Sequence, residues 1–234
     1  MKLFVTSDLH GKIEGLDPQG ADLVLMAGDI APIHSLDAFG ICRQAEWVSD
    51  CFCAWCRKYP DVQFRFIPGN HDWFATDRNL LSEIRWPDNA RMLVDEADEV
   101  CGLKLYGTPW VPYINGCWAF ETTDDSQLDE HFSLIPDGLD ILLTHAPPRL
   151  PRQKIDVSLQ WNSPHFGSPA LTKSIKRAKP CYVFCGHIHT GDHRPIPLRH
   201  SNGRLTMVRN VSRIDENYEI AFPPVELSVW KSRF

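Results

Sequence analysis

The chain contains 234 residues, of which 43% are hydrophobic and 23% charged, a composition typical of globular proteins. A single hydrophobic core can serve a chain of this length, so we expect one domain spanning residues 1–234. The 24 lysines and arginines stand against 30 aspartates and glutamates, which gives a formal net charge of −6. That balance argues against a protein that coats extended nucleic acid.

The apolar runs are short. Each of them, residues 23–27 for example, falls far below the ~18 residues that cross a bilayer. The N-terminal segment reaches Asp8 before it can form the apolar centre of a secretory signal. We therefore expect no membrane span and a cytoplasmic location. Since cytosolic thiols stay reduced, we interpret the eight cysteines as mostly buried thiols. No pattern in the sequence predicts the oligomeric state.

Apolar runs with polar ends alternate with amphipathic stretches along the chain. From the N-terminus they predict buried strands at 3–6 and 23–27, a helix at about 36–59, buried strands at 64–67 and 141–143, a helix at about 170–178, a buried strand at 181–185, and half-exposed strands at 205–211 and 225–230. Strands that alternate with helices in this way indicate a layered α/β fold with at least one mixed sheet.

Two residue clusters have an ordinary structural interpretation. Cys51, Cys53 and Cys56 lie inside the predicted helix, where a turn of about 100° per residue points Cys51 and Cys53 well apart. We favour core or surface thiols over a metal site. The basic run from Lys173 to Lys179 is interpreted as the solvated face of the second helix.

Side chains that can bind metal follow each of the five predicted buried strands. In chain order they are Asp8 and His10, Asp29, Asn70 and His71, His145, and His187 and His189. Loops beyond the carboxyl ends of the strands meet in one crevice of an open α/β sheet, so these side chains can converge. The sequence therefore predicts a composite site. Five other histidines lack such a position and are interpreted as structural: His34, His131, His165, His193 and His200.

Glycine directly precedes the candidate ligand at three of these strand ends, as Gly28, Gly69 and Gly186. Glycine lets the backbone turn abruptly or come close to a bound group. Each glycine alone could simply make a turn, but three in equivalent positions favour a functional interpretation.

The donor set indicates which ions the site could take. Seven side chains offer carboxylate, amide or imidazole donors and no thiolate: Asp8, His10, Asp29, Asn70, His145, His187 and His189. Such donors suit manganese, iron, cobalt, nickel or zinc. Seven donors are too many for one ion, whereas two ions with Asp29 between them leave room for a shared water. A centre of this kind keeps net positive charge and should attract an anion.

Five segments together resemble the five motifs of the calcineurin-like metallophosphoesterases and occur in that family's order. They are SDLHG at 7–11, GD at 28–29, GNHD at 69–72, THAPP at 144–148 and GHIH at 186–189. The segment LYGTPW at 105–110 looks most like the small metallophosphoesterase-domain-containing branch. The resemblance implies a four-layer αββα sandwich, in which two mixed β-sheets are flanked by helices.

The resemblance also implies a role for each site residue. Asp8, His10, Asp29 and His189 would surround one divalent metal ion, and Asp29, Asn70, His145 and His187 the other, with manganese the most favoured metal. A metal-bridging hydroxide would attack phosphorus. His71 would protonate the departing oxygen, with Asp72 orienting it. The ordinary alternatives for His71 are a third imidazole ligand or a packed surface histidine.

The expected activity is hydrolysis of phosphodiester bonds in small substrates such as cyclic nucleotides. The family's Ser/Thr protein phosphatases carry Asp-Arg-Gly soon after Gly-Asp, whereas here Asp29 is followed by Ile30 and Ala31. The alternatives are a nuclease or a phosphomonoesterase of the same superfamily, or a non-catalytic interaction scaffold. The aromatic segment 110–120, with Trp110 and Trp118, could stack a nucleobase or pack onto the body.

Overall fold

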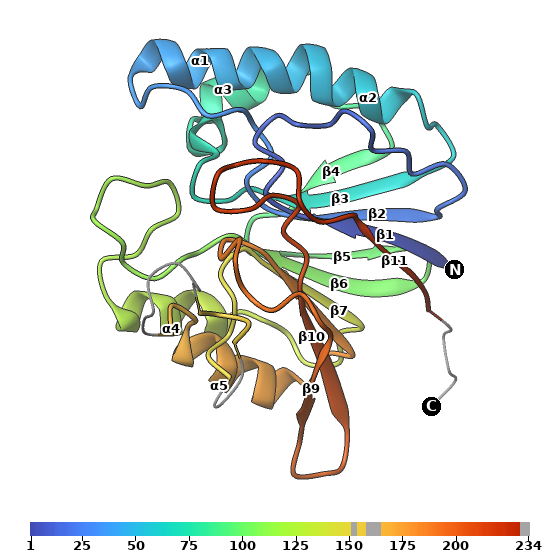
Figure 1. The fold of residues 1–234 in the computed structure, drawn as a ribbon, viewed down its shortest axis with the longest axis vertical. Coiled ribbons are helices and arrows are strands. Elements are labelled where there is room, and N and C mark those ends of the chain that lie inside the picture. The colour runs from blue at the N-terminus through green and yellow to red at the C-terminus, as the bar shows by residue number, and fades with distance from the viewer. Residues whose placement is uncertain (151–153, 158–164, 230–234) are drawn as a thin grey trace.

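Two β-sheets lie face to face between two layers of helices in the computed structural model (Figure 1). The structure describes residues 1–150, 154–157 and 165–229. The first sheet has five strands in the order β11-β1-β2-β3-β4, and the second has six in the order β5-β6-β7-β8-β10-β9. This architecture confirms the expected αββα sandwich.

The first sheet contains the three N-terminal strands that the sequence predicts. Its members are β1 (Lys2–Thr6), β2 (Leu23–Ala27), β3 (Gln63–Ile67), β4 (Ala90–Met92) and β11 (Val225–Ser228). The strands β1 to β4 are parallel, and β11 pairs antiparallel with β1, so the sheet is mixed. The predicted strand 225–230 is present as β11, and Trp230 lies outside the described residues.

The second sheet carries the remaining predicted strands. Its members are β5 (Glu96–Val100), β6 (Leu103–Thr108), β7 (Ile141–Thr144), β8 (Tyr182–Cys185), β9 (Ile196–Arg199) and β10 (Leu205–Asn210). The four central strands are parallel, and β5 and β9 close the two edges antiparallel. The edge strands β4, β5 and β9 and the central strand β6 were not among the predictions.

Helices cover the outer face of each sheet (Figure 1). The predicted helix 36–59 is α1 (Ala38–Trp47), a π-helical turn (Val48–Phe52) and α2 (Cys53–Arg57), which with α3 (Arg78–Glu83) lie over the first sheet. The predicted helix 170–178 is α5 (Pro169–Ala178), which lies beside α4 (Asp125–Ser133) over the second. A short 3-10 helix, Trp73–Thr76, follows β3.

Three apolar layers separate the four layers of secondary structure. Along β2, Val24 and Met26 pack toward the helices with Phe52, while Leu23 and Leu25 pack toward the second sheet. Both faces of the central strands are therefore buried, which explains why they appear in the sequence as unbroken apolar runs. A third layer joins the second sheet to α4 and α5.

The basic helix face and the cysteine cluster of the first helix agree with their ordinary interpretations, but the expectation of mostly buried thiols is wrong. All eight cysteines are free, and only Cys53, Cys56 and Cys185 are buried, whereas four others, Cys51 among them, are exposed. Lys173 and Arg177 project from α5 and form ion pairs with exposed aspartates of the neighbouring segment. Within the described residues, every helix is too short or too polar to span a bilayer.

Burial predicts which thiols of the helix react. Burial raises the pKa of Cys53 to about 11 and raises the pKa of Cys56 still further. We therefore expect a thiol reagent at neutral pH to modify Cys51 in the native protein while Cys53 and Cys56 react only after denaturation, as peptide mapping would show. Protection of Cys51 by added zinc would instead indicate a thiolate metal site.

Candidate metal centre

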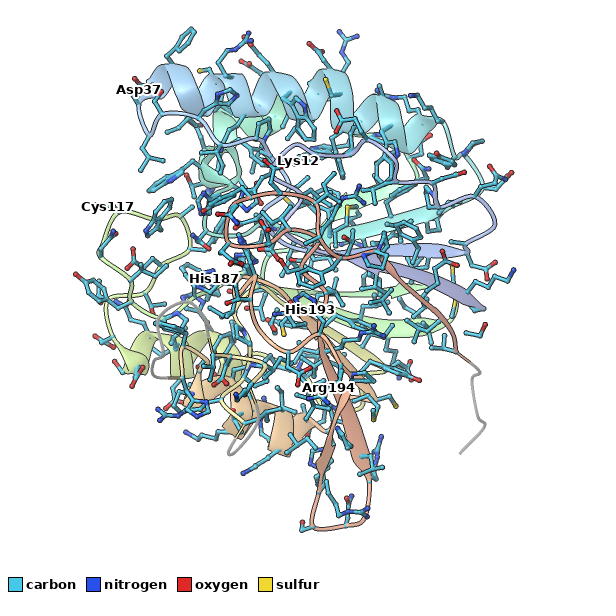
Figure 2. The ribbon with its side chains drawn as sticks, viewed as in Figure 1. Lys12, Asp37, Cys117, His187, His193 and Arg194 are labelled. Atoms are coloured by element: carbon cyan, nitrogen blue, oxygen red, sulfur yellow. The ribbon has the colours of Figure 1, made fainter. Side chains whose placement is uncertain are left out.

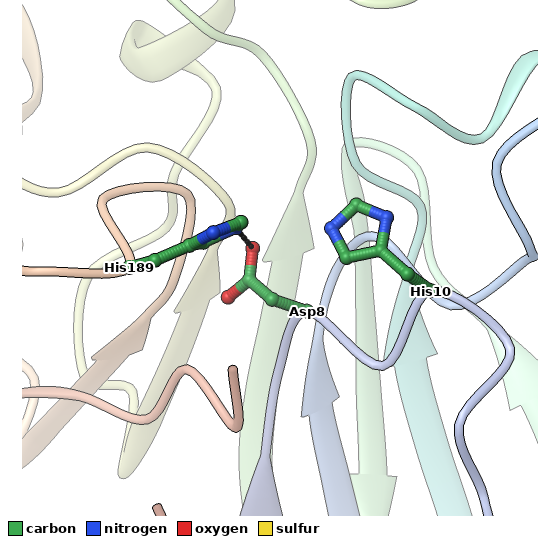
Figure 3. A group of neighbouring side chains, drawn as sticks. All are labelled: Asp8, His10 and His189. Carbon is green, nitrogen blue, oxygen red and sulfur yellow. Dashed lines mark ion pairs between the residues drawn. The ribbon is translucent and has the colours of Figure 1, made fainter. Parts of the chain in front are cut away.

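The seven predicted donors come together where five strands of the two sheets end. Asp8 Oδ1 lies 3.4 Å from His189 Nε2, and Figure 3 shows these two side chains beside His10. Asp29 Oδ2 lies 3.5 Å from His10 Nε2 and 3.3 Å from His145 Nε2. The remaining two donors adjoin His145: Asn70 Oδ1 is 2.9 Å from its Nε2, and the His187 ring is 5.0 Å away, centroid to centroid.

Two groups of three donors are close enough to share an ion. Asp8, His10 and His189 form one group, and Asp8, Asp29 and His145 form the other, with the ligand atoms of each group within 4.8 Å of one another. Both carboxylates thus lie between the two sets of imidazoles. Asp29 as the shared ligand stays a prediction, because the carboxylate of Asp8 has a similar central position.

The backbone at four donors adopts the left-handed conformation. The φ angles are 54° at Asp8, 43° at His10, 53° at Asp29 and 67° at His187. This conformation is uncommon for residues with a side chain and requires support from its surroundings. Hydrogen bonds between the loops supply it: Asp8 N donates to Gly28 O and His10 N donates to Asp29 O, both at 2.9 Å. Strain concentrated on the donors indicates a functional site.

The three glycines make room for donor side chains. A Cβ atom at Gly69 would overlap Asp29 Oδ1, and one at Gly186 would overlap Asp8 Oδ2. A Cβ at Gly28 would overlap the ring of His145, and Gly28 also has a left-handed φ of +101°. At Gly69 and Gly186 the requirement is close approach alone, because their φ angles lie outside that region.

Opposite charges compensate one another inside the cluster. Burial opposes ionisation of Asp29, but the imidazoles of His145 and His71 outweigh it and hold its pKa well below the usual value. Burial likewise opposes protonation of His145, and Asp29 outweighs it, so that the pKa of His145 rises to about 9. At His10 and His187 burial dominates and lowers the pKa to about 4 and about 3. Both rings are therefore neutral and able to bind a cation.

The residues present fit divalent cations. Both ring nitrogens of His10 are buried without a hydrogen-bond partner among the described residues, although buried polar atoms are normally paired. The rings of His145 and His189 donate through Nδ1 to the carbonyls of Ala27 (2.9 Å) and Asp215 (3.1 Å). Metal-binding histidines are typically held in this way, which leaves Nε2 for the ion.

A buried asparagine at the end of β10 supports the last donor segment. Asn210 Nδ2 donates to Ile188 O at 2.6 Å and so anchors the segment that carries His187 and His189. Three of the histidines interpreted as structural have partners outside the donor set: His131 pairs with Asp95, His165 with Asp156, and His200 with Thr206. His193 donates to His189 O at 3.0 Å and supports the same segment.

His71 lies beside the donors, but Asp72 does not orient it. The His71 amide donates to Asp29 Oδ1 at 2.8 Å, and its ring packs at 4.8 Å from the ring of His10. The carboxylate of Asp72 points instead toward backbone amides and accepts hydrogen bonds from the N–H groups of Ile30, Ala31 and Gly69. The predicted orienting role is therefore wrong, and Asp72 ties the loop after β3 to the loop after β2.

The cluster forms the floor of an open pocket of about 340 Å³. Asp29, Asn70, His71, His187 and His189 line its floor. Its rim contains Ile114 and Ile188, which lie in segments that the sequence singles out, and four residues that no sequence pattern marks: Phe166, Thr190, Glu216 and Tyr218. The Tyr218 ring lies 5.1 Å from the His10 ring and 5.3 Å from the His189 ring. No motif marks Tyr218, which lies in a turn after β10.

The close approach at Gly69 predicts a specific defect. In Gly69→Ala the new methyl group displaces the carboxylate of Asp29, so metal affinity should fall by about 10- to 100-fold, as when a ligand's support is lost. Calorimetric titration of metal-free protein with Mn²⁺ measures this. Gly138→Ala is the control, because a Cβ there meets nothing within 4 Å, and the strain at its φ of +75° should lower stability without moving a donor. Equal affinities of Gly69→Ala and the control would contradict the role of Gly69.

Comparisons with known proteins agree with the geometry. A family model described as calcineurin-like phosphoesterase matches residues 1–191. Metallophosphoesterase domain-containing protein 1 of Homo sapiens is 25% identical over 247 residues, covering 95% of this chain and 69% of that protein. UPF0046 protein T07D4.2 of Caenorhabditis elegans is 38% identical over 104 residues, covering 44% of this chain and 25% of that protein.

The fold has counterparts among solved structures. One crystal structure aligns with a TM-score of 0.60 at 14% identity, covering 89% of each chain. The family model extends over all five strand-end segments that supply the donors, from Asp8 to His189. The chain belongs to the calcineurin-like phosphoesterase family.

Proposed function

We propose that this protein is a metal-dependent hydrolase of phosphodiester bonds in small substrates, cyclic nucleotides among them. Family membership supports the phosphoester chemistry. The observation that carries the proposal for this chain is the cluster of seven oxygen and nitrogen donors, in which neither ring nitrogen of His10 has a hydrogen-bond partner among the described residues. A scaffold without activity would have no need to bury these groups together.

The donor groups suggest how two ions would be held. Asp8, His10, Asp29 and His189 would bind one, and Asp29, Asn70, His145 and His187 the other. Manganese is the metal we favour, with iron, nickel, cobalt and zinc as alternatives that the same donors accept. Divalent ions bound there would lower the pKa of water, so that it could act as a nucleophile at neutral pH, and would offset negative charge on the phosphoryl oxygens.

His71 is proposed as the general acid. An alkoxide leaves poorly unless it is protonated, and an imidazole can supply that proton. The ring of His71 lines the pocket beside Asn70 and is held between the rings of His10, at 4.8 Å, and Trp118, at 4.5 Å. This packing holds the His71 ring at one side of the pocket floor, where it would face the leaving-group oxygen of the substrate.

The charge of the pocket favours a small phosphodiester. Among the described residues that line it there is no lysine or arginine, and Glu216 adds a carboxylate to the rim. A long polyanion usually requires several basic contacts, so the nuclease alternative has less support. A diester carries less negative charge than a monoester and would meet less repulsion from Glu216. The cytoplasm is the compartment we propose, which suits eight free thiols.

A metal and substrate panel tests the proposal. Metal-free protein would be reloaded singly with manganese, nickel, zinc or iron and assayed on bis-nitrophenyl phosphate, nitrophenyl phosphate and 3′,5′- and 2′,3′-cyclic nucleotides. We expect restored hydrolysis of the diesters, greatest with manganese. Activity on the monoester alone would overturn the bond assignment, and no hydrolysis with any metal would leave the scaffold interpretation.

The role of His71 predicts a dependence on the leaving group. His71→Ala should slow esters with alkyl leaving groups by about 10²- to 10⁴-fold, whereas nitrophenyl esters, whose leaving group needs little protonation, should lose far less. Steady-state rates on a paired series of esters measure this. His34→Ala, an exposed histidine away from the pocket, is the control. Equal losses on both kinds of ester would refute the assignment.

A further inference from the structure

The pocket combines a polar floor with an apolar rim. Three rim residues keep large apolar side chains in solvent: Ile114 is 42% exposed, Phe166 40% and Tyr218 36%. Trp118, partly buried, lines the same rim. Exposed apolar groups gathered at the mouth of a pocket typically mark a ligand-binding surface.

Glu121 holds the loop that carries Trp118. Its carboxylate accepts hydrogen bonds from the backbone N–H groups of Ile114, Asn115 (2.6 Å), Gly116 (2.9 Å) and Trp118 (3.1 Å). The loop extends from the body of the protein, with Cys117 labelled on it in Figure 2. Because one carboxylate accepts hydrogen bonds from four backbone N–H groups of the loop, the loop has one defined conformation although most of its residues are exposed.

The aromatic segment 110–120 therefore divides into two parts. Trp110 points inward, where its Nε1 donates to Asp95 at 2.6 Å and its ring stacks at 3.6 Å on the ring of His131. Trp118 points to the pocket and packs at 4.5 Å from the ring of His71. Tyr218 approaches from a different segment, with its ring 6.3 Å from the ring of His71. Both aromatic side chains thus border the position proposed for the leaving group.

The charge of this rim limits what it could bind. Glu216 is its charged residue among the described lining, and it would repel a second phosphate. A flat, uncharged group would avoid that repulsion and would replace water on the faces of Trp118 and Tyr218. Base stacking on aromatic side chains is tolerant of base identity, because every base has a π-face.

We propose that Trp118, positioned by Glu121, forms with Ile114 and Tyr218 a subsite for a flat, uncharged ring of the substrate, next to the phosphoryl position. The ring is a nucleobase or another aryl group. The subsite deepens the proposed function and relies on it only for the location of the phosphoryl group. Trp118 contacts the ring, and Glu121 acts through the loop as a positioning residue.

Ligand pairs with and without a ring test the subsite. Dissociation constants on the manganese-loaded protein would be measured by calorimetry for ligands without a phosphodiester bond to hydrolyse: 5′-AMP against ribose 5-phosphate, and phenylphosphonate against methylphosphonate. In the wild type we expect the ring-bearing member to bind about 5- to 100-fold more tightly, the range that one stacked ring provides. Preference in only one pair would identify the ring as a nucleobase or as a simple aryl group.

Substitutions in the loop that carries Trp118 test whether the preference for ring-bearing ligands comes from that loop. Trp118→Ala should bring the ratio of the two dissociation constants close to one, Glu121→Gln should reduce it in part, and Trp118→Phe should retain most of it. Tyr113→Ala is the matched control, because Tyr113 is a 60% exposed aromatic residue of the same loop outside the pocket lining. A defect in folding or in the position of His71 would weaken both members of a pair and leave the ratio unchanged.

The outcomes separate this inference from the proposed function. A wild-type ratio near one, or a ratio that Trp118→Ala leaves unchanged, would overturn the subsite even if every ester is hydrolysed. Conversely, ring-dependent binding by a protein that hydrolyses nothing would retain the subsite and refute the proposed activity.

Discussion

Asp8 and Asp29 are only 0% and 1% exposed, and a buried carboxylate is costly unless positive charge or hydrogen-bond donors surround it. Among the described residues the basic side chains beside them are all imidazoles: His145 and His189, whose pKa values are raised, and the neutral ring of His10. Imidazole can compensate the carboxylates as a cation when no metal is bound and can serve as a neutral ligand when one is. The requirement to compensate two buried charges therefore accounts for the dense packing of histidine around them.

The layered fold makes this packing possible. β1, β2 and β3 belong to one sheet and β7 and β8 to the other, and the ends of both sets meet above the apolar layer between the sheets. Glycines at the strand ends remove Cβ atoms that would collide with the donors. Asp72 then fixes two of the loops to each other through backbone N–H groups. The donors are thus held by backbone geometry on rigid strands, which favours a defined arrangement over an adaptable one.

The rim of the pocket is formed by loops, whereas its floor is formed by residues at the strand ends. Trp118 and Tyr218 lie on loops outside the strand ends, one organised by Glu121 and the other by a turn in which Asp215 accepts from the amides of Asn217 and Glu219. Lys12 also donates to the carbonyl of Tyr218 and links that turn to the loop after β1. Loops of this kind can differ among proteins whose metal-binding residues are the same. The donors at the floor of the pocket therefore determine the class of reaction, and the loops at its rim determine which substrate is bound.

The sequence alone predicted five buried strands, the helices α1 to α2 and α5, and the seven donors, because each leaves a local pattern, whereas the helices α3 and α4 and the central strand β6 were not predicted. An unbroken apolar run such as β2 must be buried on both faces, and a polar residue directly after it must lie at the edge of the sheet. The edge strands were missed because short, half-exposed segments such as β4 and β5 have weak patterns. Tertiary structure alone decided that Asp72 binds backbone amides, that Gly69 and Gly186 avoid collisions, and that Trp118 and Tyr218 border the pocket. These properties arise from contacts between segments far apart in the chain, and such contacts leave no periodic signal in either partner.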